Sequence, residues 1–446
     1  MAFLSPVFRP FNSFDSFWTQ IPADDGAIRA SQAYICQCGR PIFFRNSFCV
    51  NCGASLGYET TSARLQTLVP VADPAAQPEQ MVSTDLWTLW HDPEGAQYRR
   101  CANLQAIGCN WLLPGDAAPG SVCLACSLNR TVPDLSIADN VSAWRALEIA
   151  KRHLVAQLLV MGLPVASKIT QDPERGMAFD FLRPLPDKPV LTGHDEGIIT
   201  LNIQEANDAH RELVRSTMHE PYRTLLGHMR HEIGHYYWDR LVDNTPWLED
   251  YRALFGDERA DYAEALKRNY AEGPPQDWPQ RFVSTYASSH PWEDWAETWA
   301  HYLHMVDTLG TAMRFGLNAK DVELPYAPFD SQALWKPDDP GAETFLKIIN
   351  AWVELTCVLN EMSRSMGESD FYPFVLPKPV VAKLQFIHCL VLQARQVPDL
   401  PLTPQQAAEP EPPAVDATQS QTQSQTPADA VADVADVADE KSAASV

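Results

Sequence analysis

The sequence lacks three features that would each place the protein in a particular setting. No apolar run approaches the roughly 20 residues that a membrane-spanning helix needs. The amino terminus, MAFLSPVFRPFNSF, has neither a basic start nor a continuous apolar core, so it does not resemble a signal peptide. An excess of positive charge is missing too, because 34 basic residues face 57 acidic ones and leave a net charge of −23. We therefore expect a cytosolic protein without membrane attachment, and nucleic acid is a disfavoured partner.

The composition divides the chain into four regions. A cysteine-rich stretch covers residues 34–58, and a connector of about residues 60–83 leads to a second cysteine-containing unit at 84–135, which includes the expected strand LWTLW. Helical patterning dominates residues 142–396 and is interrupted by two expected strands, MAFDFLRP and GIITLNI. Residues 397–446 form an acidic tail rich in Ala, Asp, Pro and Gln, which we expect to be disordered.

Eight of the ten cysteines fall before residue 127. In a cytosolic protein such clustering indicates metal binding more often than disulfides. Cys357 and Cys389 stand apart, and we expect both to be buried apolar side chains.

The first cysteine cluster has the pattern of a zinc ribbon. Each of its two cysteine pairs is followed by a glycine, Gly39 or Gly53. Zinc knuckles have glycine at this position because it allows a tight turn that directs backbone N–H groups toward the thiolates. Four thiolates around one ion make a closed, structural site. The predicted ligands are Cys36, Cys38, Cys49 and Cys52.

The second cluster has a less regular spacing but ends in a C-x-x-C pair. We interpret it as another closed zinc site, formed by Cys101, Cys109, Cys123 and Cys126. Neither site is expected to do chemistry. Zinc ribbons often recruit other proteins, so a protein partner is a possible separate role for this region.

A different metal motif lies in LLGHMRHEIGHYYWDRLV, residues 225–242. On a helix, His231 and His235 project from one face, one turn apart, where two imidazoles can share a zinc ion. Glu232 stands beside them, placed to take a proton from the attacking water rather than to bind the metal. His228, one turn earlier, is better explained as a structural residue.

The third ligand must come from elsewhere in the chain. A metzincin would need glycine and histidine where this sequence has Trp238 and Leu241, which excludes that class. An aspzincin would use an aspartate such as Asp257 or Asp261 in GDERADYAEAL.

A gluzincin would use a glutamate on a second helix, and we favour this alternative. Pro291 suits the first turn of such a helix. Glu293, Glu297, His301 and His304 would then share one face, which would be costly to bury without a metal or counterion. In this interpretation Glu293 binds zinc and Glu297 holds the far nitrogen of a ligating histidine.

At this point the chain resembles a known family, the bacterial zinc-binding metallopeptidases that carry an amino-terminal zinc ribbon. The resemblance runs from about residue 34 to 394 through ICQCGRPIFFRNSFCVNCG, CNWL, CLACSLNRTVPDLS, RTLLGHMRHEIGHYYWD, FGDERADYAEAL and HPWEDWAETWAHYLH. It adds little about the substrate.

The peptidase half is also similar, more distantly, to gluzincins of the anthrax lethal factor type. In those proteins a tyrosine stands seven residues before the ligand glutamate, and Tyr286 and Glu293 match that spacing. The resemblance implies that Glu293 is a ligand, that Glu297 supports a histidine and that Tyr286 donates to the transition state. It leaves Asp257 and Asp261 as ion-pairing or capping residues.

The sequence therefore predicts an α+β protein, with zinc-ribbon modules ahead of a mainly helical, gluzincin-like domain that contains a small β-sheet. We expect one catalytic and two structural zinc ions, and hydrolysis of a peptide or protein substrate with Glu232 as the base. Tyr286, with His290 as a further candidate, would stabilise the oxyanion. The alternative is a non-enzymatic binding protein in which every zinc is structural.

Overall fold

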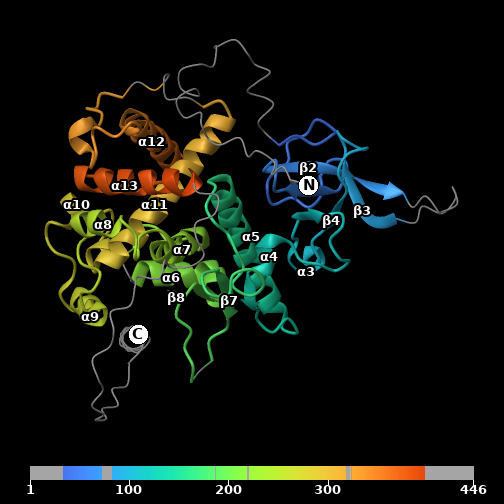
Figure 1. Ribbon diagram of the computed structural model, residues 1–446, viewed down its shortest axis with the longest axis horizontal. Helices are drawn as coiled ribbons and strands as arrows, with labels where there is room; N and C mark the ends of the chain where they lie inside the picture. Colours follow the sequence, from blue (N-terminus) through green and yellow to red (C-terminus); the bar gives the residue numbers. More distant parts are fainter. Residues whose placement is uncertain are drawn as a thin grey trace, which may run out of the picture.

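The computed structural model of the chain describes residues 34–72, 83–185, 187–217, 220–317, 322 and 324–396. A β-rich amino-terminal part stands beside a mainly helical part (Figure 1). This confirms the predicted α+β class, with a ribbon region ahead of a helical domain. The predicted disorder of residues 397–446 lies outside the described residues. In the described part of the chain, no helix combines the length and the apolar character that a bilayer span requires.

One antiparallel sheet runs through both cysteine-containing regions. Its five strands follow each other in chain order: β1 (Leu56–Glu59), β2 (Arg64–Ala72), β3 (Ser83–Leu89), β4 (Tyr98–Arg100) and β5 (Leu112–Pro114). The expected strand LWTLW corresponds to β3, whereas β2 lies in the stretch that the sequence suggested was a connector. Two short helices, α3 (Leu104–Ile107) and α4 (Leu124–Ser127), accompany the second cysteine cluster. The two clusters therefore share one sheet.

A second, smaller sheet belongs to the helical part. Its strand order is β6 (Asn129–Thr131), β7 (Ala178–Leu182), β9 (Ile198–Asn202) and β8 (Gly193–Asp195). The first three strands are parallel and β8 is antiparallel to β9. Strands β7 and β9 confirm the two strands expected from MAFDFLRP and GIITLNI.

Helices make up most of the remaining described chain. The longer ones are α5 (Ala138–Val160), α6 (Asp208–Thr217), α7 (Leu225–Leu241), α8 (Leu248–Phe255), α9 (Tyr262–Glu272), α11 (Pro291–Arg314), α12 (Ala342–Ser365) and α13 (Lys378–Gln396). Short turns are η1 (Ile203–Ala206), α10 (Trp278–Arg281), η2 (Tyr286–Ser288) and η4 (Ser331–Ala333). Helix α7 packs against α11 and α5, and α12 and α13 pack on α11.

A glycine inside the HEIGH motif sets how closely α7 and α11 approach. A Cβ atom at Gly234 would lie 3.1 Å from the Cα of Ala296 and 3.2 Å from the Cβ of Trp299, both on α11. The indole N–H of Trp295 donates to the carbonyl of Gly234 at 2.8 Å. Close packing of the two helices thus depends on the missing side chain at this position.

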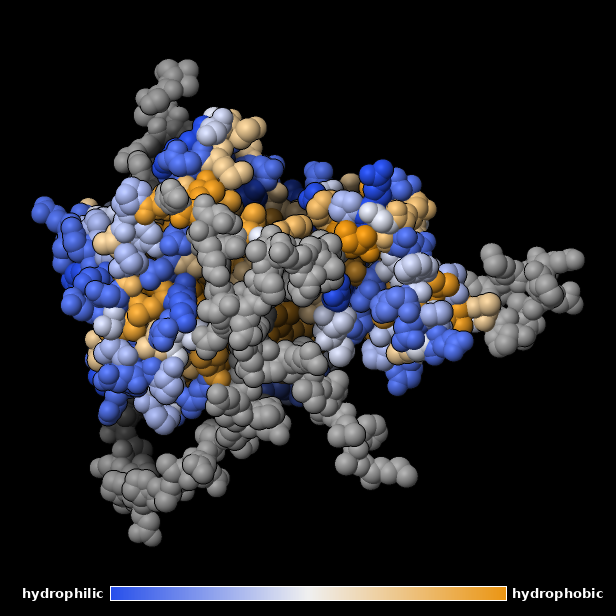
Figure 2. All heavy atoms as spheres, turned by 90° about the horizontal axis from the view of Figure 1, so that it is seen from above, coloured by the Kyte–Doolittle hydropathy of each residue, from blue (hydrophilic) through white to orange (hydrophobic). Residues whose placement is uncertain are grey.

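The amino-terminal part rests directly on α5. The rings of Phe44, from the first cysteine region, and His153 lie 5.7 Å apart, and Arg145 donates to the carbonyl of Ala106 at 2.9 Å. Seen from above, both parts present apolar patches, in orange, among hydrophilic residues (Figure 2).

The two isolated cysteines are less buried than expected. Cys357 is exposed and Cys389 is only half-buried, so the expectation of two core side chains is wrong for Cys357. The buried face of α12 includes Trp352 and Thr356, and the residue after Thr356 points away from that face.

Candidate metal centre

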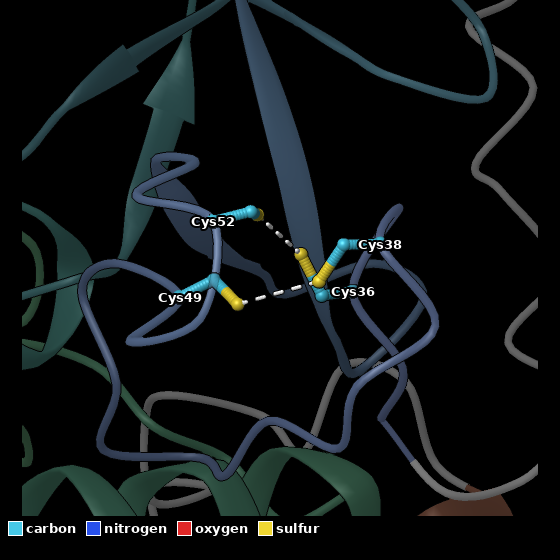
Figure 3. Close-up of side chains that lie close together, drawn as sticks. All are labelled: Cys36, Cys38, Cys49 and Cys52. Carbon is cyan, nitrogen blue, oxygen red and sulfur yellow. Dashed lines mark hydrogen bonds between the residues drawn. The ribbon is translucent and has the colours of Figure 1, made fainter.

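The four cysteines of the first cluster point toward one another (Figure 3). The sulfur of Cys36 lies 3.6 Å from that of Cys52, and the sulfur of Cys38 lies 3.7 Å from that of Cys49. A tetrahedral zinc ion with Zn–S bonds of about 2.3 Å places its sulfurs about 3.8 Å apart, whereas a disulfide bond is about 2.05 Å long. The spacing fits four zinc-binding thiolates and does not fit disulfides.

Both knuckle glycines adopt the backbone conformation that the sequence suggested. Gly39 has φ of +77° and Gly53 has φ of +74°, and their N–H groups close tight turns onto the carbonyls of Cys36 and Cys49. A hydrogen bond from the backbone of Arg40 lowers the pKa of the Cys38 thiol to about 6. A lowered pKa favours the thiolate, the form that binds zinc.

The second cluster has the same compactness and is fully buried. The sulfur of Cys109 lies 3.7 Å from the sulfurs of both Cys123 and Cys126. The N–H of Cys123 donates to the sulfur of Cys101 at 3.3 Å. All four sulfurs lie within 4.8 Å of one another, so this cluster also fits a closed zinc site.

Helix α7 carries the HEIGH motif. The helix begins after Thr224, whose hydroxyl accepts a hydrogen bond from the N–H of Gly227 at 3.0 Å and so caps the first turn. His231 and His235 then lie one turn apart, with ring centroids separated by 5.0 Å. Both side chains face α11.

Helix α11 brings a glutamate to the two histidines. Pro291 occupies its first turn, as predicted, and Glu293 is buried on the face toward α7. Its Oε2 lies 2.9 Å from Nε2 of His231 and 3.7 Å from Nε2 of His235. The structure thus brings together the three residues that the sequence singled out as ligands.

The donor set and its spacing fit a zinc ion. Two imidazole nitrogens and one carboxylate oxygen lie within 4.8 Å of one another. Ligand bonds of about 2.0–2.2 Å in a tetrahedral arrangement imply donor atoms about 3.3–3.6 Å apart, which the two measured distances bracket. Oε2 of Glu293 is buried and faces the Nε2 atoms of the two histidines, as expected for an atom that would bind a metal.

Neighbouring side chains orient the candidate ligands. Oε1 of Glu297 lies 2.8 Å from Nδ1 of His231, and the hydroxyl of Ser284 donates to the other oxygen of Glu297 at 2.7 Å. With its proton on Nδ1, His231 turns the lone pair of Nε2 toward Glu293 and His235. The hydroxyl of Tyr262 donates to Oε1 of Glu293 at 2.6 Å, which leaves Oε2 to face the histidines.

The electrostatics of this cluster favour a cation. Burial alone would lower the pKa of His231, but the adjacent carboxylates of Glu293 and Glu297 raise it well above its usual value. Burial alone would raise the pKa of Glu293, yet His235 and His231 lower it well below the ordinary range. Two buried carboxylates thus attract positive charge to one spot, and a divalent ion would supply such charge.

Glu232 and Tyr286 lie at the open side of the cluster. Both line the same cavity as His231 and Glu297. The rings of Tyr286 and His231 are 5.9 Å apart. Burial raises the pKa of the Glu232 carboxyl, against the lowering effect of the two histidines. A raised pKa suits a carboxylate that takes up a proton and later returns it.

His290 has another role than the one expected from the sequence. It caps α11: its Nδ1 accepts from the N–H of Trp292 at 3.1 Å, and its Nε2 lies 3.1 Å from the carbonyl of Ala260. Both ring nitrogens are therefore engaged with backbone groups, and neither is free to donate to an oxyanion. This geometry corrects the candidate catalytic role of His290.

The aspartates of the alternative ligand set lie in structural roles. Asp257 forms an ion pair with Arg259 at 2.7 Å. Asp261 caps α9 by accepting from the N–H of Glu264 at 2.9 Å. Neither belongs to a cluster of metal-binding groups among the described residues.

Sequence reasoning missed Tyr262 and Ser284. Tyr262 lies in the segment FGDERADYAEAL, in which the sequence indicated only the aspartates that an aspzincin would use as ligands. Ser284 has no distinguishing pattern around it, since it precedes the short turn η2 in an irregular segment. Their roles depend on hydrogen bonds across the fold rather than on spacing in the sequence.

Comparisons with known proteins agree with this picture. A family model described as "Putative zinc-binding metallo-peptidase" matches residues 140–390, and a zinc-ribbon model matches residues 33–137. Similar curated relatives include uncharacterized proteins of Mycobacterium bovis and of two strains of Mycobacterium tuberculosis. Each is 42% identical over 355 residues, covering 79% of this chain and 93% of the relative. No solved structure gives a significant match.

Proposed function

The chain belongs to the family of zinc-binding metallopeptidases, with a zinc-ribbon domain ahead of the peptidase region, and on that premise we propose that it hydrolyses peptide bonds at one zinc site. In this proposal His231, His235 and Glu293 hold the ion as in gluzincins. The observation that carries the proposal is the convergence of two Nε2 atoms and one Oε2 atom beside a cavity.

The chain's own residues divide the chemistry between them. A bound zinc ion supplies Lewis acidity, which polarises the peptide carbonyl and acidifies the attacking water. The carboxylate of Glu232 accepts the proton from that water and then gives it to the leaving amine nitrogen. The hydroxyl of Tyr286 donates a hydrogen bond to the developing oxyanion. Glu297, Ser284 and Tyr262 hold the ligands in place.

The two cysteine clusters have a separate place in the proposal. Each would hold one structural zinc ion and stiffen the sheet that rests on α5. The same region could recruit a protein partner. Nucleic acid remains disfavoured because of the net charge of −23. The ten free thiols suit a reducing compartment, so the proposal keeps the cytosol as the location.

Purified full-length protein is expected to contain three zinc ions per chain and to cleave peptides in a metal-dependent way. Brief treatment with a chelator should remove the more open third ion first and abolish cleavage, and added zinc should restore it. Elemental analysis and a mass-spectrometric peptide assay measure the two quantities. Three firmly held ions without cleavage of any peptide would favour a non-enzymatic, zinc-stabilised binding protein instead.

Glu297→Ala is expected to weaken zinc binding at the peptidase site by about 10–100-fold without emptying the cysteine sites. The physical reason is that His231 loses the carboxylate that fixes its ring and its proton. Competition with a zinc-sensitive dye gives the affinity. Ser284→Ala serves as the graded control, because it removes only the hydrogen bond to Glu297 and should have a smaller effect in the same direction.

A further inference from the structure

The cavity beside the metal centre extends well past the candidate zinc ligands. It has a volume of about 260 Å³ and starts at His231, Glu232 and Tyr286. From there it follows α7 back to Gly227 and α11 forward to Thr308. The mechanism proposed above uses only its first end, so the remaining space has no assigned role.

The far end of the cavity has an aromatic wall. His301 and His304 come from α11, Trp352 from α12, and Tyr372 and Phe374 from the segment that follows α12. The ring of Phe374 lies 4.4 Å from that of His301 and 5.1 Å from that of Tyr372, which in turn lies 4.8 Å from Trp352. Edge-to-face contacts of this kind favour a further ring.

The charged groups beside this wall already have partners. Arg223 pairs with Glu205 at 2.7 Å and with Glu220 at 2.9 Å, so its positive charge is neutralised and one negative charge remains over. The histidines of the wall are uncharged at neutral pH: burial lowers the pKa of His301 to about 4 and lowers that of His304 well below its usual value. An acidic side chain would lose its hydration here without gaining a counterion.

The wall also lies at the right distance from the proposed chemistry. The candidate ligand Glu293 lies on α11 eight residues before His301, about 12 Å along the helix axis, and eleven residues before His304, about 17 Å. Backbone positions in an extended peptide are about 3.3–3.6 Å apart, and a large side chain reaches several ångströms further. A residue one or two positions from the bond being cut can therefore reach the near end of the wall, at His301.

The volume of the cavity favours a bulky side chain. An apolar cavity of about 150 Å³ is already large enough to take up benzene. The volume of about 260 Å³ covers the whole cavity, its catalytic end included, and is large enough to accept one phenyl or indole ring. Phe371, also part of the lining, is 47% exposed and extends the apolar surface toward solvent.

We propose that this cavity is the substrate's specificity subsite, and that it takes a large apolar, preferably aromatic, side chain of a residue flanking the cleaved peptide bond. The inference rests on the proposed peptidase function. It makes the protein selective against peptides that carry Asp or Glu at that position.

The test uses zinc-loaded full-length protein and a peptide library with every position varied, with cleavage products identified by mass spectrometry. We expect Phe, Tyr, Trp or Leu to be favoured about tenfold or more over Ala and Asp at one position beside the cut. Calorimetry with the Glu232→Gln variant gives a second readout, because the matching Phe peptide should bind more tightly than its Ala counterpart even without turnover.

Two variants change the size of the cavity in opposite directions. Phe374→Ala removes part of the wall and should reduce the preference for aromatic residues about tenfold. Thr308→Trp fills the far end and should exclude large side chains while Ala-containing peptides are still cut. Phe315→Ala is the matched control, because Phe315 is 61% exposed near the end of α11 and lies outside the lining. Thermal unfolding checks that each variant is folded.

The outcomes separate this inference from the proposed function. Cleavage without any preference for large apolar residues overturns the subsite and leaves the peptidase function intact. An unchanged preference in both Phe374→Ala and Thr308→Trp also overturns it. Absence of cleavage in zinc-loaded protein overturns the peptidase function, and calorimetry then decides separately whether the cavity binds aromatic peptides.

Discussion

Replacing Glu232 by glutamine is expected to lower kcat/KM for peptide cleavage by about 10²–10⁴-fold while the protein keeps its fold and all its zinc. Glutamine has nearly the same shape as glutamate but cannot accept a proton. Glu232 lines the cavity next to His231. It does not belong to the group of candidate metal ligands, which consists of His231, His235 and Glu293. Steady-state kinetics on a single peptide and elemental analysis measure the two effects.

The comparison of activity with metal content makes this prediction specific. A variant that loses zinc together with activity would show that Glu232 is a ligand rather than a base. A variant that keeps full activity would remove the proposed base altogether. The matched control is Glu212→Gln, because Glu212 lies on the exposed helix α6 in an ion pair with Arg215 at 2.7 Å.

Glu293→Ala is expected to reduce the zinc content from three ions per chain to two. The buried carboxylate supplies the third donor atom, and without it only two imidazoles remain for the ion. Activity should be lost along with the metal. Elemental analysis after dialysis against a weak chelator gives the result directly.

Asp257→Ala and Asp261→Ala are the matched controls, and both should keep three zinc ions. Asp257 pairs with Arg259 at the surface, and Asp261 caps α9, where its loss should cost about 1 kcal/mol of stability without affecting the metal. If Asp261→Ala emptied the site while Glu293→Ala did not, the aspzincin alternative would replace the gluzincin assignment.

The parts of the site that the sequence could predict are those governed by local spacing. The four-residue interval between His231 and His235 places both on one helix face, and the cysteine intervals define compact knuckles. Glu293 is 58 residues beyond His235. It was nevertheless predictable, because it begins a stripe of polar residues along one face of an otherwise apolar helix. The structure places it beside the two histidines, while its role as a ligand remains a prediction.

The parts that escaped prediction depend on contacts between distant segments. Tyr262 meets Glu293 only because α9 and α11 fold together, and the sequence offers no periodicity that would reveal this. His290 was a further candidate for stabilising the oxyanion, although its backbone partners make it a helix cap. The cavity is likewise assembled from residues between Thr192 and Phe374, which no single motif connects.

The fold shows the same division. Strands β7 and β9 were predictable from their runs of apolar and β-branched residues. Strand β2 was missed because its proline and the Pro/Ala/Gln residues after it suggested a connector. Pairing with β1 and β3 supplies the hydrogen bonds that stabilise this strand.

The absent side chain at Gly234 limits how far this protein can be altered. A single methyl group there would press on the backbone of Ala296 at 3.1 Å, so α11 would have to move by a few tenths of an ångström. Reactive groups generally tolerate displacements of only about 0.5 Å. Replacement of Gly234 by alanine would already shift α11 by much of this distance, although position 234 is not among the candidate metal ligands. In directed evolution or redesign of this protein, we therefore expect position 234 to tolerate few substitutions, although glycine has no side chain that could take part in chemistry.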